Sequence, residues 1–179
     1  MTTKNLFLMC GLPGAGKSTF LKKHAKTENS IIISRDTIRF SLVQPNEEYF
    51  SHEDEVTATF WKQINAALAE GKNVFADQTS LTPKARKWFL DHVHGYEKIH
   101  IVWIDADLES CLERNENRKG TRAYVPKGVI RRMDNQFVEP TFNEDERIDY
   151  IWRYDPEINT LNIKEKEGKH DLSDVRFTS

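Results

Sequence analysis

A glycine-rich segment directly after a short apolar run constrains the fold of this chain most. Leu6–Cys10 reads as a buried strand, and Gly11–Ser18 reads Gly-Leu-Pro-Gly-Ala-Gly-Lys-Ser, a full match to GxxxxGK(S/T). Glycines let the backbone wrap until its N–H groups converge, and a helix beginning at Lys17 directs the positive end of its dipole to the same point. The pattern predicts a strand–loop–helix unit that binds phosphate; the alternative is a glycine-rich turn that binds nothing.

Short apolar runs alternate with helical stretches along the rest of the chain. We expect strands at residues 31–34, 73–76 and 99–104, with a last strand or hairpin at 149–154 and 161–164. We expect helices at about 17–26, 51–70, 83–94 and 107–118, and from 126 to before Pro140. The alternation predicts a three-layer α/β fold, with a parallel sheet of about five strands between helices on both faces.

Several helix ends have recognisable signals. Ser51–Asp54 has the form of a capping box, and Gly71 is placed to end the same helix. Thr82 and Asp107 are predicted N-caps, and Pro126 is expected to open the last long helix.

Length and composition fit one domain. The 179 residues contain 38% hydrophobic residues, and 26 basic against 28 acidic residues leave a net charge of −2, which excludes nucleic-acid binding by bulk charge. We assign residues 1–165 to the domain and 166–179 to a charged C-terminal tail. No apolar run is long enough for a secretion signal or a membrane span, and Cys10 and Cys111 are predicted to be buried reduced thiols. We therefore expect a cytoplasmic protein.

The glycine-rich loop predicts binding of ATP and Mg²⁺. Lys17 supplies a compact charge for the β and γ phosphates, and the Ser18 hydroxyl joins the Mg²⁺ shell. The guanine-reading Asn-Lys-x-Asp and the switch Asp-x-x-Gly of GTPases are both absent. The expected nucleotide-binding residues are Gly11, Pro13, Gly14, Ala15, Gly16, Lys17, Ser18 and Thr19, together with Arg118 and Arg122.

Two acids follow predicted strands at the edge where ligands bind in parallel sheets. We assign Asp77 to Mg²⁺, held through water, and Asp36 to the general base that takes a proton from an acceptor hydroxyl. The alternative is that each acid only caps the following helix. Arg39 lies one turn after Asp36 and could hold an acceptor phosphate, orient Asp36, or form a simple surface ion pair.

A basic segment at about residues 114–138, which we call the lid, joins two predicted helices. It has six basic and no acidic residues between Arg118 and Arg132, which favours closure over a phosphate site; a solvated helix surface is the alternative. Arg118 and Arg122 are expected at the nucleotide, while Arg131 and Arg132 could contact a polyanionic acceptor.

Taken together, Gly11–Ser18, Ser34–Arg39, Asp77–Ser80 and Arg114–Pro126 resemble the kinase module of bacteriophage-type and bacterial polynucleotide 5′-hydroxyl kinases, within the P-loop kinase superfamily. The resemblance spans about residues 6–140. It implies transfer of the ATP γ-phosphate to the 5′-OH of DNA or RNA. It also implies four roles: base for Asp36, acceptor-phosphate binding for Arg39, lid arginine for Arg118 and strand-end acid for Asp77.

The chain departs from the family pattern at Ser80, where the family commonly has asparagine. Two other classes of protein contain the same glycine-rich loop. One is a kinase of a small-molecule hydroxyl on a metabolite, nucleoside or antibiotic, and the other is a nucleotide-binding regulatory module without transfer activity. The joint presence of Asp36, Arg39 and Arg118 argues against the second.

Overall fold

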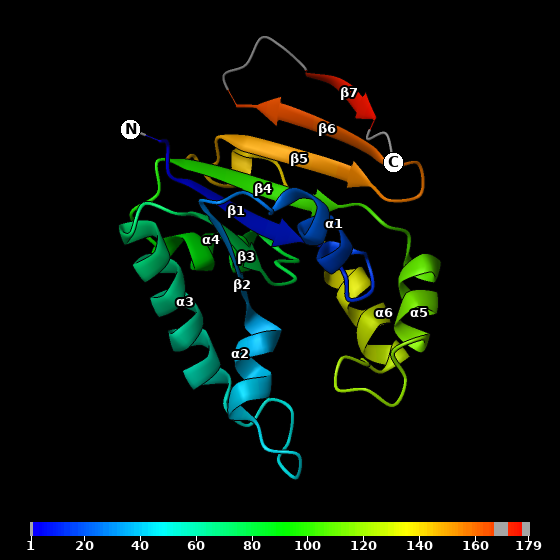
Figure 1. Ribbon diagram of the computed structural model, residues 1–179. Helices are drawn as coiled ribbons and strands as arrows, with labels where there is room; N and C mark the ends of the chain where they lie inside the picture. The colour runs from blue at the N-terminus through cyan, green and yellow to red at the C-terminus, as the bar shows by residue number, and fades with distance from the viewer. Residues whose placement is uncertain (1, 167–171, 177–179) are drawn as a thin grey trace.

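The computed structural model describes residues 2–166 and 172–176, which form one α/β unit built on a single sheet (Figure 1). In chain order the elements are β1 (Asn5–Cys10), α1 (Lys17–His24), β2 (Ser30–Ser34), α2 (Arg35–Leu42), α3 (Glu53–Ala69), β3 (Asn73–Asp77), α4 (Pro83–His92), β4 (Lys98–Ile104), α5 (Leu108–Glu116), α6 (Lys127–Gln136), a 3₁₀ turn (Phe142–Glu144), β5 (Tyr150–Asp155), β6 (Thr160–Glu165) and β7 (Leu172–Arg176).

The strand order across the described sheet is β2-β3-β1-β4-β5-β6-β7. The first five strands are parallel, as expected, and β6 and β7 add an antiparallel extension. The hairpin expected at residues 149–164 is confirmed as β5 and β6. β7 lies within the segment assigned to the tail, where the sequence pattern predicts no strand.

Alternate residues of the central strands pack into two separate cores. In β1, Leu6, Leu8 and Cys10 face the core shared with α3 and α4, whereas Met9 faces the core shared with α1 and α5. Successive side chains of a strand point to opposite faces, so a strand buried on both faces is apolar at nearly every position. The three-layer arrangement expected from the sequence is therefore confirmed, with helices on both faces of the sheet in Figure 1.

Most of the predicted helix ends are confirmed. The Thr82 hydroxyl accepts from the Ala85 N–H, and the Asp107 carboxylate accepts from the Ser110 N–H. Gly71, with a φ of 84°, follows α3. Helix α1 ends at His24, two residues earlier than expected.

The capping box expected at residues 51–54 is wrong. The Ser51 hydroxyl donates to the carbonyl of Glu48 in the preceding turn, so it is not available to the first turn of α3. His52 occupies the N-cap position without a side-chain cap bond, and its ring contacts Glu47 and Glu55 instead.

Cys10 and Cys111 are both free and buried, as expected. None of the helices in residues 2–166 is both long and apolar enough to cross a membrane.

Candidate active site

In the loop between β1 and α1, the lysine side chain binds the backbone at the start of the same loop. Gly16 takes a left-handed conformation with a φ of 104° at the N-cap of α1, a position that favours glycine. The Lys17 ammonium donates to the carbonyls of Gly11 and Leu12, at 3.0 and 2.8 Å. Burial lowers the pKa of Lys17, and the charge of Asp77 opposes this. A cation that is partly withdrawn from water next to a helix N-terminus is well placed to meet a phosphate.

Helix α5 packs directly against this loop. A Cβ added to Gly14 would lie 2.4 Å from the carbonyl oxygen of Cys111, and Gly14 has a φ of +81°. Arg114, one turn further along α5, donates to the carbonyls of Gly14 and Ala15 at 3.3 and 3.2 Å. The loop shape therefore depends on contacts with α5 as well as on its own glycines.

We expect Gly14→Ala to weaken binding of ATP about tenfold or more, because the added methyl group meets backbone and the left-handed conformation is strained for alanine. Titration calorimetry with a non-hydrolysable ATP analogue measures this. Gly128→Ala in α6 is the matched control, since nothing lies within 4 Å of its Cβ position, and its affinity should match wild type. Equal affinity for the Gly14 variant would contradict the packing argument.

Asp36 stands at the start of α2 without capping it. The cap is Ser34, whose hydroxyl accepts from the Thr37 N–H at 3.3 Å, so the alternative that Asp36 is only an N-cap is wrong. Its Oδ1 accepts hydrogen bonds from Arg39 and from the Tyr49 hydroxyl. Its Oδ2 receives no hydrogen bond from any described residue, and the side chain is 61% exposed. One carboxylate oxygen is thus held by the protein while the other remains available to a ligand.

Arg39 is buried beneath Asp36. Its Nε donates to Glu53 at 2.6 Å, and its Nη1 donates to Asp36 and to the Tyr49 hydroxyl. Arg35 donates to the other oxygen of Glu53 at 3.0 Å. Because Arg39 is buried and bridges two carboxylates, the simple surface ion pair is wrong. These contacts match the alternative in which Arg39 holds Asp36 in place.

Asp77 lies at the end of β3, beside Ser34 at the end of β2. It does not cap α4, because Thr82 does. Burial raises the pKa of Asp77, the charge of Asp36 acts in the same direction, and the charges of Lys17 and Arg118 lower it. Neither the Asp77 carboxylate nor the Ser18 hydroxyl has a hydrogen-bond partner among the described residues.

The uncommitted oxygens of Ser18 and Asp77 fit Mg²⁺, which prefers hard oxygen ligands. The described residues contain no group of three or more metal-binding His, Cys, Asp or Glu side chains. An Mg²⁺ ion bound with a nucleotide takes one or two protein ligands and completes its shell with water and phosphate oxygens.

Most basic side chains of the lid are already paired with other groups of the protein. Four of the six basic residues between Arg118 and Arg132 already have partners: Lys119 and Lys127 with Glu116, Arg131 with Glu109, and Arg122 with the end of α2. The Arg118 guanidinium has no partner among the described residues, and its charge acts on Asp77. Of the two arginines expected at the nucleotide, Arg118 is therefore the one that remains available.

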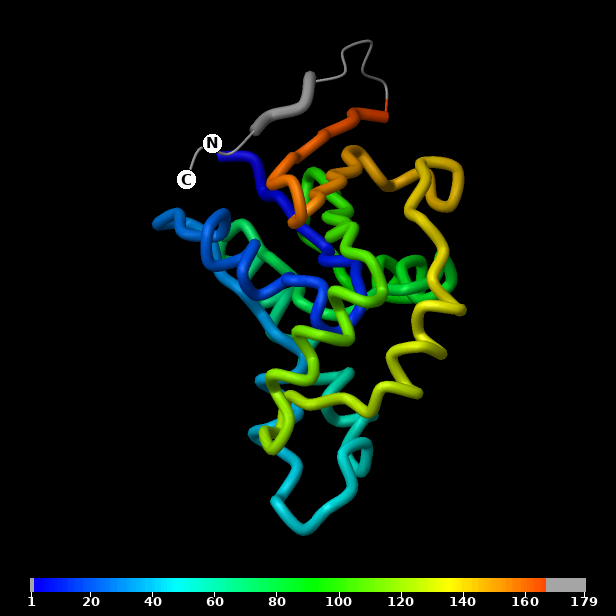
Figure 2. Tube along the Cα trace, turned by 90° about the vertical axis from the view of Figure 1, so that its right-hand side faces the viewer, coloured from blue at the N-terminus to red at the C-terminus, as the bar shows by residue number. Residues whose placement is uncertain are grey.

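Arg122 links the lid to α2. It donates to the carbonyls of Phe40 and Val43, at 3.1 and 2.9 Å, and lies over the Phe40 ring. At the other end of this lid turn, buried Asn115 exchanges hydrogen bonds with the backbone of Val125. Figure 2 shows the lid segment running close to α2 and the loop that follows it. These contacts hold the lid turn against the end of α2.

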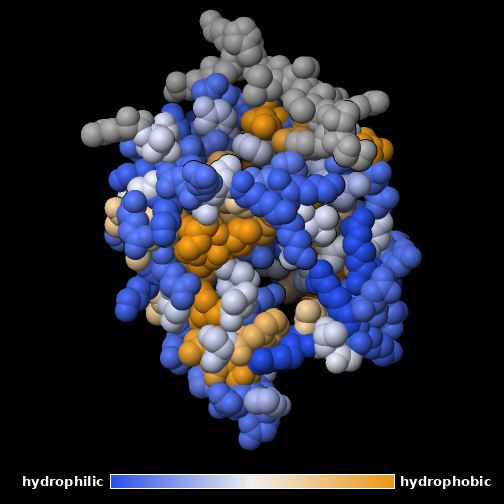
Figure 3. All heavy atoms as spheres, viewed as in Figure 1, coloured by the Kyte–Doolittle hydropathy of each residue, from blue (hydrophilic) through white to orange (hydrophobic). Residues whose placement is uncertain are grey.

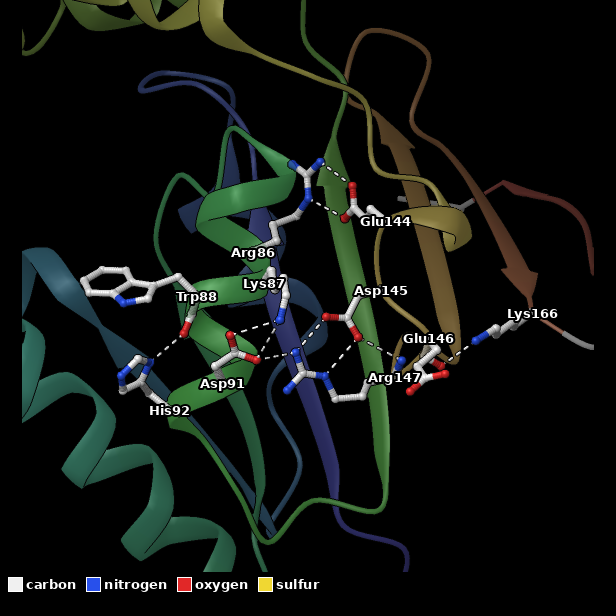
Figure 4. A network of polar contacts seen from close by, with 10 residues as sticks. All are labelled: Arg86, Lys87, Trp88, Asp91, His92, Glu144, Asp145, Glu146, Arg147 and Lys166. Atoms are coloured by element: carbon white, nitrogen blue, oxygen red, sulfur yellow. Dashed lines mark hydrogen bonds and ion pairs between the residues drawn. The ribbon is translucent and has the colours of Figure 1, made fainter.

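Arg86 is a site-supporting residue that sequence reasoning missed. It is 1% exposed and makes a two-pronged ion pair with Glu144, at 2.6 and 2.8 Å (Figure 4). It also donates to the carbonyls of Ser80 and Val138. It thereby ties the loop after Asp77 to the exit of the lid. Its place within a charged helical stretch gave no sign of burial, since a Lys/Arg-rich stretch normally marks a solvated face.

The loop that follows Asp77 also contacts the phosphate loop between β1 and α1, because the Gly11 N–H donates to the Thr79 carbonyl at 2.9 Å. The charges of Lys17, Asp36 and Arg118 all act on Asp77, so these four groups lie near one another at the carboxyl ends of the parallel strands. Figure 3 shows this side of the molecule hollowed, with hydrophobic residues gathered over β2 and α2 and mostly hydrophilic residues over α5 and α6.

The parallel sheet, the phosphate loop after β1 and the strand-end acids define a P-loop kinase fold. The chain belongs to the AAA domain family AAA_33, whose model matches residues 6–140. Membership implies nucleotide binding, and the family-level resemblance seen in the sequence is confirmed.

Four relatives match by sequence, including the following two. The chain is 29% identical over 184 residues to the L-seryl-tRNA(Sec) kinase of Methanococcus maripaludis, covering 92% of this chain and 70% of that protein. It is 27% identical over 155 residues to a candidate bifunctional polynucleotide kinase/RNA ligase of Autographa californica nuclear polyhedrosis virus, covering 77% of this chain and 21% of that protein.

Solved structures share the fold at lower identity. A chain of the Pnkp1/Rnl/Hen1 RNA repair complex superposes with a TM-score of 0.66 at 22% identity, covering 76% of this chain and 44% of that one. A sugar kinase from Janibacter sp. HTCC2649 superposes with a TM-score of 0.61 at 14% identity, covering 86% of each chain. This chain spans less than half of the repair-complex chain and about a fifth of the viral protein.

Proposed function

We propose that this protein transfers the γ-phosphate of ATP to the 5′-hydroxyl end of a polynucleotide, with Asp36 as the general base. The proposal depends on the hydrogen bonding of the Asp36 carboxylate. Its Oδ1 accepts hydrogen bonds from Arg39 and Tyr49, whereas its Oδ2 accepts none from the described residues and the side chain is exposed. A general base needs this combination of fixed position and open access.

The proposed mechanism uses few groups. The loop backbone and the N-terminus of α1 bind the β and γ phosphates, and Lys17 neutralises charge on them. Asp36 Oδ2 takes the proton of the attacking hydroxyl, and Arg118 stabilises the charge of the transferring phosphoryl group. Ser18 and Asp77 would hold Mg²⁺, which supplies further charge neutralisation at the phosphates.

The relatives favour a nucleic-acid acceptor over a small alcohol. Two are named for kinases that act on tRNA or polynucleotides, and one structural neighbour comes from an RNA repair complex. The sugar kinase is the specific observation for the small-molecule alternative. The tRNA kinase, whose name places its acceptor on seryl-tRNA, covers more of this chain than the viral relative does, so seryl-tRNA belongs in the same experiment.

We expect a single-stranded 5′-OH oligonucleotide to become labelled from γ-³²P-ATP in the presence of Mg²⁺, and to remain unlabelled when the metal is chelated. The same oligonucleotide carrying a 5′-phosphate is the matched control and should remain unlabelled. Labelling of a sugar or of seryl-tRNA in preference to the 5′-OH oligonucleotide would overturn the choice of acceptor. Tight ATP binding with no phosphorylated product from any acceptor would favour the regulatory module.

A further inference from the structure

Two aromatic residues stand exposed next to Asp36. Tyr49 and Phe50, which we call the aromatic platform, lie in the loop between α2 and α3 and are 38% and 62% exposed. They are two of six large hydrophobic side chains found exposed in the described residues, and they are adjacent in the chain. An exposed aromatic pair beside a reactive group is a feature to be explained, because isolated exposed hydrophobic residues are common but clusters mark binding surfaces.

The platform is held in place rather than loosely attached. The Tyr49 ring packs edge-on against Phe50, with ring centres 4.6 Å apart. The guanidinium carbon of Arg39 lies 4.6 Å from the centre of the Tyr49 ring and 5.6 Å from that of Phe50. Burial, followed by the charge of Asp36, raises the pKa of Tyr49 to about 12, so its hydroxyl stays protonated and donates to Asp36.

The charged residues near the platform limit where a nucleic-acid backbone can lie. The platform's own loop and the start of α3 carry four exposed acidic residues, namely Glu47, Glu48, Asp54 and Glu55. These carboxylates repel phosphate. Phe40 also packs against Tyr49, and the guanidinium carbon of Arg122 lies 4.7 Å from the centre of the Phe40 ring. The phosphates of a strand end at Asp36 would therefore be directed away from these acids, and its terminal base toward the platform.

We propose that Phe50, supported by Tyr49, stacks the base of the nucleotide that carries the acceptor hydroxyl. The Tyr49 hydroxyl donates a hydrogen bond to Asp36, and the Tyr49 ring contacts Phe50. A nucleobase stacked on Phe50 would therefore lie within about one nucleotide of the carboxylate that takes the proton. Stacking suits any nucleobase, since each has a π-face. The proposal rests on the function proposed above and assigns the subsite that positions its acceptor.

The test compares two 5′-OH oligonucleotides, one normal and one lacking the base of its terminal nucleotide. We expect Phe50→Ala to raise KM for the normal oligonucleotide roughly tenfold and to leave kcat within about twofold of wild type. For the oligonucleotide without the terminal base, wild type and Phe50→Ala should have the same KM. Phe50→Trp should restore the wild-type KM on the normal oligonucleotide, because tryptophan offers a larger stacking face.

Trp88→Ala is the matched control: Trp88 is another half-exposed aromatic, on α4, and its loss should leave KM unchanged. Unaltered ATP affinity shows that the Phe50 variant is folded. A KM for Phe50→Ala within twofold of wild type, or an equal rise on both oligonucleotides, overturns the subsite and leaves the proposed function standing. If wild type phosphorylates neither oligonucleotide, the proposed function fails and the subsite fails with it.

Discussion

Asp36→Asn is expected to lower kcat for phosphorylation of a 5′-OH oligonucleotide by about 100- to 10,000-fold, the range found for loss of a general base. Asparagine keeps the size of the side chain and an oxygen that can face Arg39 and Tyr49, but it cannot take the proton at the position of Oδ2. Steady-state kinetics measure the loss. ATP affinity, measured by calorimetry, should stay close to wild type because the phosphate loop does not include Asp36.

Asp54→Asn is the matched control, since it removes one negative charge from an exposed residue in the first turn of α3 that makes no hydrogen bond to Asp36. Its kcat should stay within about threefold of wild type. If both variants lost activity equally, the effect would come from long-range charge. An unaltered kcat in the Asp36 variant would remove Asp36 as the base.

Arg86→Ala is expected to have the largest effect on stability, a loss of about 3–5 kcal/mol in the free energy of unfolding. The substitution leaves Glu144, whose side chain is 6% exposed, as a buried charge without its partner. It also leaves the carbonyls of Ser80 and Val138 without their side-chain donor. Denaturant unfolding measures the difference, and the thermal midpoint should fall by roughly 10 °C.

Lys87→Ala tests whether burial is the cause. Lys87 is the next residue of α4 and pairs with Asp91 at 3.1 Å, but it is exposed. Its loss should cost only about 0.3–0.5 kcal/mol, the usual value for such helix pairs. Similar losses in the two variants would mean that the Arg86 pair contributes no more than a surface ion pair.

Local patterns in the chain were enough to predict the parallel sheet and the phosphate loop. β1, β3 and β4 are apolar at nearly every position because both faces of the sheet are covered, and such runs are visible in one dimension. The order β2-β3-β1 places Asp36 and Asp77 at one edge, as expected. The capping box at Ser51 failed because the hydroxyl had a competing partner in the preceding turn, which no spacing rule reveals.

The burial and the partners of the charged residues could not be predicted from the sequence. Counting basic residues in the lid predicted a broadly positive surface, yet acids on α5 neutralise several of them, and Arg122 binds carbonyls at the end of α2. Arg86 and Arg39 look like ordinary charged helix residues in the sequence, and both are buried. Their partners, Glu144 and Glu53, lie 58 and 14 positions away along the chain.

The sequence by itself determined the class of fold and the position of the phosphate loop, because both depend on short patterns of hydrophobicity and on glycines at fixed spacing. Only the tertiary structure decided which carboxylate oxygen is free at Asp36, which lid arginine remains available, and that Tyr49 and Phe50 stand beside the proposed base. The reason is physical: burial and pairing depend on distances between segments far apart in the chain, and these distances exist only after the sheet and helices have packed.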